Sequence, residues 1–97
     1  MTTRNLRTEK GSSVKNQFVI TTNNATYFQS YQSVVAKVVN GRLVEVSRHW
    51  CYSNTTMRQL YRFLSQYANL SVHKAEIVQM LDNGTIRLQP TNSLTIV

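Results

Sequence analysis

The sequence predicts an α+β fold: a small antiparallel sheet of two hairpins plus a late strand, packed with two helices, and an extended N-terminal arm. β-branched and aromatic residues are concentrated in short runs between residues 17 and 46, as in strands. Two of these runs are separated by Asn23-Asn24 and two by Asn40-Gly41, pairs that accept the left-handed backbone of a tight turn. From Met57 the apolar period changes to that of a helix.

Residues 1–16 are expected to form a polar, basic N-terminal arm, and residues 17–97 a single α+β domain. The first segment, MTTRNLRTEKGSSVKN, is rich in Thr, Ser, Asn and charged residues and has no sustained apolar period. A chain of 97 residues has room for one core only. We expect the arm to become ordered only where it lies on a partner.

Five strands are predicted in chain order. QFVITT from Gln17 and ATYFQSY from Ala25 form the first hairpin, and SVVAKVV from Ser33 and RLVEV from Arg42 form the second. TIRLQP from Thr85 is read as a short closing strand that the proline ends.

Two helices follow the hairpins. The first is predicted from Met57, because apolar residues there recur on one face of a helix. The second is predicted from about Val72 to Asp82, with Ser71 as its N-cap and the Asn-Gly pair at 83–84 as its stop. Three large residues are assigned to the core: Trp50, Tyr61 and Leu64.

The stretch HWCYSNTT, which starts at His49, is interpreted as a strand end followed by a helix start. Trp50 and Tyr52 alternate with Cys51 at strand spacing, so the two aromatic side chains should share one face. The polar quartet that follows can accept hydrogen bonds from the free N–H groups of the first helical turn. Two of its residues are assigned as the structural helix cap: Ser53 and Thr55.

Three features of the sequence occur together in a recognisable order. They are SYQSVVA at residues 30–36, the glycine hairpin at Asn40-Gly41, and YSNTT at residues 52–56 followed by a helix. This arrangement resembles a widespread family of small, uncharacterised phage-encoded proteins, whose members have SY-x-T-P-I-A, a short hairpin, YS-x-TT and a helix. The resemblance covers about half of the chain, from Tyr27 to Leu64.

The chain departs from this family pattern in two places. Ser33 and Val34 stand where the family has Thr-Pro, and Gln59 stands where members often carry histidine. The resemblance implies a phage or mobile-element origin and a compact, strand-rich domain. It implies no activity and no mechanism.

The sequence lacks the residue sets that most catalytic and metal sites need. The only nitrogen or sulfur ligands are His49, Cys51 and His73, too few for a common zinc site. The four carboxylates are scattered along the chain, and no glycine-rich phosphate loop is present. We therefore expect no enzyme activity, no metal and no cofactor.

The charge of the chain favours anionic partners. Eleven Lys and Arg against four Asp and Glu give a formal net charge of +7. Tyr27 and Tyr31, at strand spacing, are a candidate stacking platform for unpaired bases. For the arginines of the first helix, the apolar period favours a solvated helix face over contact with nucleic acid. The candidate contacts to a partner or to nucleic acid are Arg4, Arg7, Lys10, Lys15, Tyr27, Tyr31, Arg58 and Arg62.

These observations predict a non-enzymatic phage accessory protein that acts by binding. The first hypothesis is a minor structural or assembly-associated virion component that docks through its arm onto other phage structural proteins, in an oligomeric assembly. The alternatives are a nucleic-acid-binding accessory protein and an inhibitor of a host defence protein. No apolar run suits a membrane span or a signal peptide, so the expected location is the virion or the host cytoplasm, without membrane association or secretion.

Overall fold

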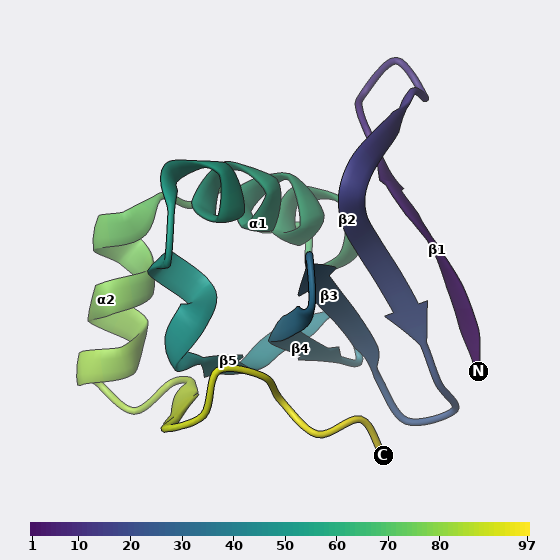
Figure 1. Cartoon of the computed structure of the whole chain (residues 1–97). Coiled ribbons are helices and arrows are strands. Elements are labelled where there is room, and N and C mark those ends of the chain that lie inside the picture. Colours follow the sequence, from purple (N-terminus) through teal and green to yellow (C-terminus); the bar gives the residue numbers. More distant parts are fainter.

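The strands of the protein form one sheet in the order in which they follow along the chain (Figure 1). The computed structural model describes all residues, 1–97. β1 to β5 pair antiparallel with their neighbours, and β6 runs parallel to β5. The predicted α+β class is confirmed, although one pair in the sheet is parallel. The strands are β1 (Thr2–Arg7), β2 (Ser13–Thr21), β3 (Thr26–Ser30), β4 (Ser33–Val39), β5 (Arg42–Ser47) and β6 (Arg87–Gln89).

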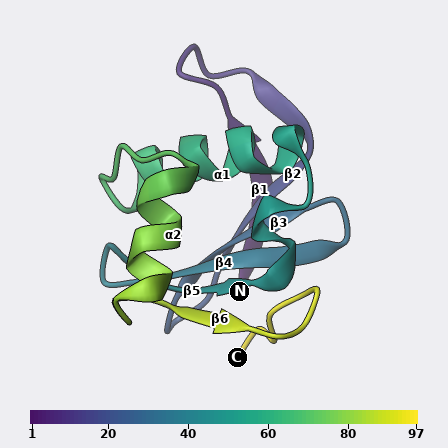
Figure 2. The ribbon, with the colours of Figure 1, turned by 90° about the vertical axis from the view of Figure 1, so that its left-hand side faces the viewer.

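Both predicted helices are present, with shifted starts. A short 3₁₀ helix, η1 (Arg48–Cys51), precedes α1 (Asn54–Tyr67), and α2 (Lys74–Asp82) follows. α1 lies over one face of the sheet, and α2 stands beside the N-terminal end of α1 (Figures 1 and 2). Val72, the predicted start of α2, is instead a buried residue ahead of the helix. Neither helix has the length and apolar composition needed to cross a membrane.

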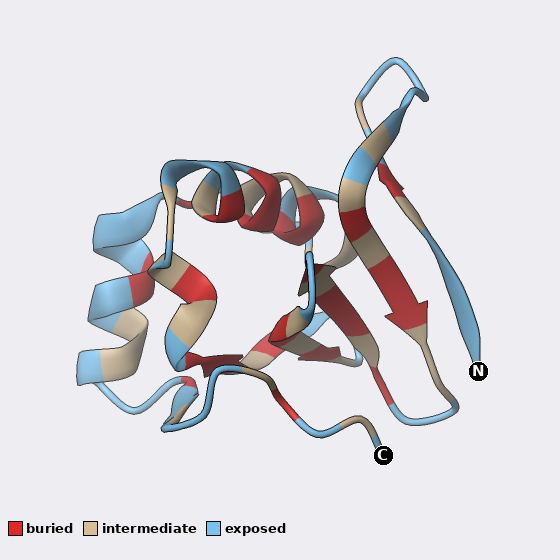
Figure 3. Ribbon diagram, in the orientation of Figure 1, coloured by how far each residue is buried: buried red, intermediate tan, exposed pale blue.

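The central strands carry buried residues on both faces (Figure 3). On the face toward α1, Phe28 stacks on Phe63 with ring centroids 5.5 Å apart, within a cluster that also holds Leu64 and Trp50. Tyr61 only packs against this cluster, half-buried. On the other face, Leu94 of the C-terminal segment covers a smaller cluster, whose other buried members are Ile20, Ala25, Tyr27 and Val34.

The two hairpins close by different means. Asn40 and Gly41 have φ of 52° and 75°, as the Asn-Gly signal predicts. Neither Asn23 nor Asn24 has positive φ. In that turn the Thr22 hydroxyl oxygen accepts hydrogen bonds from the backbone N–H groups of residues 24 and 25, at 3.2 and 3.1 Å. The first hairpin is therefore held by a threonine side chain rather than by left-handed asparagines.

The expectation that residues 1–16 form an arm outside the sheet is wrong. Residues 2–7 form the edge strand β1, which pairs with β2 from Thr2↔Thr21 to Arg7↔Ser13. Leu6, the one large apolar residue of β1, is fully buried in the main cluster. An edge strand can be mostly polar because its backbone forms hydrogen bonds with one neighbouring strand only. In β1, Leu6 is the only side chain that is buried in the core. β1 contains too few apolar residues for an apolar period to be recognised in the sequence.

The strand predicted at Trp50–Tyr52 is also wrong. Residues 48–51 turn as a 3₁₀ helix, and the Ser47 hydroxyl accepts a hydrogen bond from the backbone N–H of His49 at 3.3 Å. The turn sends neighbouring side chains in different directions. Trp50 is 4% exposed and Tyr52 is 73% exposed, so the two aromatic residues do not share a face.

Candidate functional site

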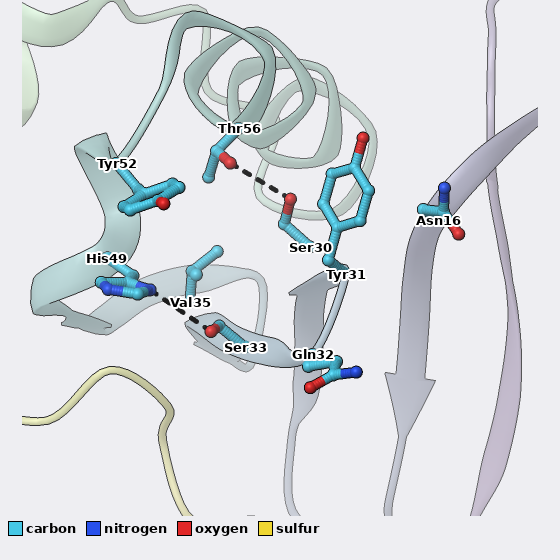
Figure 4. A pocket seen from close by; sticks show the side chains of 9 residues that line it. All are labelled: Asn16, Ser30, Tyr31, Gln32, Ser33, Val35, His49, Tyr52 and Thr56. Carbon is cyan, nitrogen blue, oxygen red and sulfur yellow. Dashed lines mark hydrogen bonds between the residues drawn. The ribbon is translucent and has the colours of Figure 1, made fainter.

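A pocket of about 420 Å³ opens between the β3–β4 turn, the end of η1 and the first turn of α1 (Figure 4). SYQSVVA supplies five of its nine lining residues, and YSNTT supplies two. The two stretches that carry the phage-family resemblance therefore meet at one place. The lining residues are Asn16, Ser30, Tyr31, Gln32, Ser33, Val35, His49, Tyr52 and Thr56.

A chain of hydroxyl groups builds one wall of the pocket. The Ser53 hydroxyl accepts a hydrogen bond from the backbone N–H of Thr56 at 3.1 Å, as an N-cap does, and donates to the Thr56 hydroxyl at 3.2 Å. The Thr56 hydroxyl lies 3.2 Å from that of Ser30, and both residues are buried. The cap prediction is confirmed for Ser53. Thr55 is an exposed residue of the first turn and makes no capping bond.

The opposite wall contains an imidazole held between two partners. His49 Nδ1 lies 3.3 Å from the Ser33 hydroxyl, and its ring packs on that of Tyr52 with centroids 4.6 Å apart. No Asp or Glu lines the pocket. The Ser-His pair therefore lacks the carboxylate that orients the imidazole in a catalytic triad. These groups can form hydrogen bonds with a ligand and stack on it.

Tyr31 stands at the mouth of the pocket on an unusual backbone. Its φ is 55°, and Asn16, across from it, has a φ of 63°. The Tyr31 N–H donates to the Asn16 carbonyl at 2.8 Å, and the side-chain amide of Gln29 donates to the Tyr31 carbonyl at 2.7 Å. A bulky residue in the left-handed region costs about 1–3 kcal/mol, and such strain gathers at binding sites. The strained turn leaves the Tyr31 side chain 55% exposed.

Beside the pocket, Gln17 has an unused hydrogen-bond acceptor. Gln17 pairs with Ser30 in the register of β2 and β3. It is 1% exposed, and its Oε1 has no hydrogen-bond partner. Buried polar atoms are nearly always paired. Gln17 Oε1 is an exception, so the fold leaves one hydrogen-bond acceptor beside the pocket without a donor.

The stacking platform of Tyr27 and Tyr31 does not form. Tyr27 is fully buried on the sheet face away from α1, where the ammonium of Lys37 lies 5.9 Å from its ring centroid. The C-terminal segment covers this face: the Leu94 N–H donates to the Val34 carbonyl at 2.8 Å. A sheet covered on both sides offers no base-stacking face there. Tyr31 alone remains accessible, and its aromatic neighbour across the pocket is Tyr52.

The basic residues predicted in the arm divide into two pairs. Arg4 donates to the Tyr67 hydroxyl at 2.9 Å, and Arg7 donates to the Gly11 carbonyl at 2.7 Å. These bonds tie β1 to α1 and close the β1–β2 turn. Lys10 and Lys15 are exposed and have no side-chain partner, so only this pair is free to meet an anionic ligand.

The two arginines of α1 also differ. Arg62 donates to Gln59 Oε1 at 2.6 Å and forms an ion pair with Glu9 at 3.4 Å. The pKa of Glu9 lies below its ordinary value. The larger cause is a hydrogen bond from the backbone N–H of Glu9 itself, and the second cause is the Arg62 guanidinium. Glu9 therefore stays charged and offsets Arg62. Arg58 is exposed and has no partner in the protein.

Sequence reasoning missed most of the pocket. His49 was considered as a metal ligand and as part of a strand, Tyr52 only as part of that strand, and Asn16 only as part of the arm. The signal that could have found them is the shared composition of SYQS and YSNTT, each with a tyrosine among small hydroxyl residues. Nothing local shows that these stretches meet, because η1 and the β3–β4 turn bring them together.

The fold and pocket define a small α+β protein with an aromatic-edged pocket that no Lys, Arg, Asp or Glu lines. The chain belongs to DUF8033, a family of unknown function, whose profile matches residues 1–79. The match includes every residue of the pocket and ends within α2, so β6 and the C-terminal segment lie outside it. No curated protein and no solved structure matches the chain.

Proposed function

We propose that this protein is a non-enzymatic accessory protein of phage origin that binds single-stranded nucleic acid, with an unpaired base entering the pocket. One observation carries the proposal: Tyr31 and Tyr52, 55% and 73% exposed, stand on different sides of the pocket (Figure 4). Exposed aromatic rings on rigid supports are the usual platforms for unpaired bases.

The chemistry of the lining supports a base rather than a phosphate. The pocket contains amides, hydroxyls and an imidazole, which match the donors and acceptors on base edges. No Lys, Arg, Asp or Glu lines it. The net charge of +7 supplies a general attraction to the phosphate backbone outside the pocket.

The phage origin is supported by the resemblance of SYQSVVA and YSNTT to the phage-family pattern. Both stretches line the pocket, so the residues that suggest the origin are those that a ligand would touch. The known family adds no activity, because its function is unknown.

Binding of a short fluorescent single-stranded oligonucleotide, measured by anisotropy at low salt, tests the proposal. Tyr31→Ala and Tyr52→Ala should each weaken binding by about 1–3 kcal/mol, the range for loss of one base–aromatic stack. Tyr52→Phe keeps the ring and should bind nearly as the wild type does. Leu88→Ala, which removes an exposed apolar side chain from β6, is the matched control.

Two results would contradict base binding. One is the absence of any binding by the wild-type protein at low salt. The other is unchanged affinity in both alanine variants, with circular dichroism showing that they are folded.

A virion assembly role is the second candidate, and the position of β1 favours it. β1 is an edge of the sheet, and Thr2, Thr3 and Arg4 on it are exposed. An open edge can accept a strand from a neighbouring subunit, so docking through residues 1–16 would take the form of strand addition onto other phage structural proteins. Mass spectrometry of purified particles should then find the protein at a defined copy number, and its absence from washed particles would exclude this role.

A further inference from the structure

A second concavity, of about 420 Å³, lies between the start of α1 and the start of α2. A smaller hollow of about 290 Å³ shares Arg58, Tyr61 and His73 with it. We call the two together the α1–α2 groove. We call the pocket of Figure 4 the base pocket. Along the chain, only Ser53 separates Tyr52 of the base pocket from Asn54 of this groove. The larger concavity is lined by Asn54, Met57, Arg58, Tyr61, His73 and Lys74.

The groove contains cations that the protein does not neutralise. Arg58 and Lys74 are exposed, and neither forms an ion pair or a side-chain hydrogen bond. No Asp or Glu lines the larger concavity, and the one acid of the smaller, Glu9, is paired with Arg62. This differs from the base pocket, where no charged residue is present.

The wall between these cations is held in place. The rings of Tyr61 and His73 pack with centroids 5.4 Å apart, and Glu76 Oε1 accepts a hydrogen bond from the His73 backbone N–H at 2.7 Å. Burial, followed by the nearby Cys51 and Glu76, raises the pKa of Tyr61. Its hydroxyl therefore keeps its proton at neutral pH and can donate to an anionic oxygen. Glu76 lines neither hollow, and its Oε1 is directed to the backbone N–H that it accepts from.

We infer that the α1–α2 groove binds phosphate groups through Arg58 and Lys74. Resting on the proposed function, we assign these phosphates to the backbone of the strand whose base enters the pocket. With an aromatic pocket without charged residues and a separate cationic groove, the bases of a strand would bind at one site and its phosphates at the other. Base contacts then depend on Tyr31 and Tyr52, and phosphate contacts on the groove.

The test uses the double variant Arg58→Ala/Lys74→Ala in the full chain. Its matched control is Arg42→Ala/Arg87→Ala, which removes the same charge from exposed residues at the start of β5 and at the start of β6, outside both the pocket and the groove. Two probes are used, a single-stranded oligonucleotide and an abasic oligomer of the same length. Loss of two phosphate contacts should lower the slope of log K against log salt by about 1.4, at about 0.7 per phosphate of a single strand.

The expected result is that the groove variant binds both probes more weakly and with the smaller slope, while the control keeps the wild-type slope. The abasic oligomer should respond to the groove variant and not to Tyr52→Ala. If the groove variant and the control bind alike, the groove assignment is overturned and the base pocket stands. If the wild type binds the abasic oligomer as tightly as the normal strand, the base pocket is overturned and the groove stands.

Inorganic phosphate alone is the third probe in this experiment. Titrated into the labelled protein, it should shift the NMR signals of Arg58 and Lys74 weakly, because one phosphate lacks the attached strand. If phosphate shifts these signals and neither oligomer binds, the assignment to a nucleic-acid backbone is overturned.

Discussion

The hydroxyl oxygens of Ser30 and Thr56 lie 3.2 Å apart and join the end of β3 to the first turn of α1. Both residues are buried, and Ser53 donates to the same threonine hydroxyl. One chain of hydroxyl groups thus runs from the helix cap to the sheet. Both residues also line the pocket, so the stability of the fold and the shape of the site depend on this contact together.

Thr56→Val tests this contact. It keeps the shape of the side chain but leaves the Ser30 hydroxyl buried without its partner. The free energy of unfolding, measured by urea titration, should fall by about 1–3 kcal/mol. Thr56→Ser retains the hydroxyl group and should lose clearly less. A valine variant as stable as the serine variant would show that the bond does not matter.

The helix cap can be tested with two adjacent alanine substitutions. Ser53→Ala removes the side chain that accepts from the Thr56 N–H, so it should lower the free energy of unfolding by about 1 kcal/mol. Thr55→Ala removes an exposed hydroxyl with no capping bond and should change stability by less than about 0.5 kcal/mol. Equal losses in the two variants would contradict the assignment of the cap.

Tyr31 should separate stability from binding. Asparagine tolerates a φ of 55° better than tyrosine does, so Tyr31→Asn should raise the free energy of unfolding by about 1 kcal/mol. The same variant should bind single strands more weakly, because the exposed ring is lost. Thermal unfolding and anisotropy measure the two effects on one sample. A variant that is less stable than the wild type would rule out strain at this turn.

Glu9 provides a prediction about pH. Its pKa, followed by NMR, should lie below the ordinary value and should rise part of the way back in Arg62→Ala, since the larger cause is its own backbone N–H. Because the folded-state pKa is lowered, the ion pair's contribution to stability is present at neutral pH. It is lost as pH falls through the folded-state pKa. An unchanged Glu9 pKa in the arginine variant would mean that the pair does not form.

Leu94 tests the cover on the second face of the sheet. Leu94→Ala should lower the free energy of unfolding by about 2–5 kcal/mol, because this side chain is 5% exposed among Ile20, Tyr27 and Val34. Val97→Ala, at an exposed position of the same segment, is the control and should have little effect. Similar stabilities for both variants would show that the segment does not cover this face in solution.

Local signals were sufficient for most of the elements. The Asn40-Gly41 pair, the runs of β-branched residues and the helical period after Met57 act over a few residues, so they can be recognised without the fold. The α+β class, both central hairpins, α1 and the Ser53 cap follow from them. β1 was missed because a strand with one buried residue, Leu6, shows no apolar period.

The sequence by itself determined the two central hairpins and the two α-helices, because turn pairs, caps and apolar periods act through neighbouring residues. Only the tertiary structure decided which side chains a ligand can reach. Tyr27 and Tyr31 look alike along the chain, yet Leu94 covers the face of the first, and a left-handed turn exposes the second. Burial depends on what packs from elsewhere in the chain, so a binding surface exists only once distant segments have met.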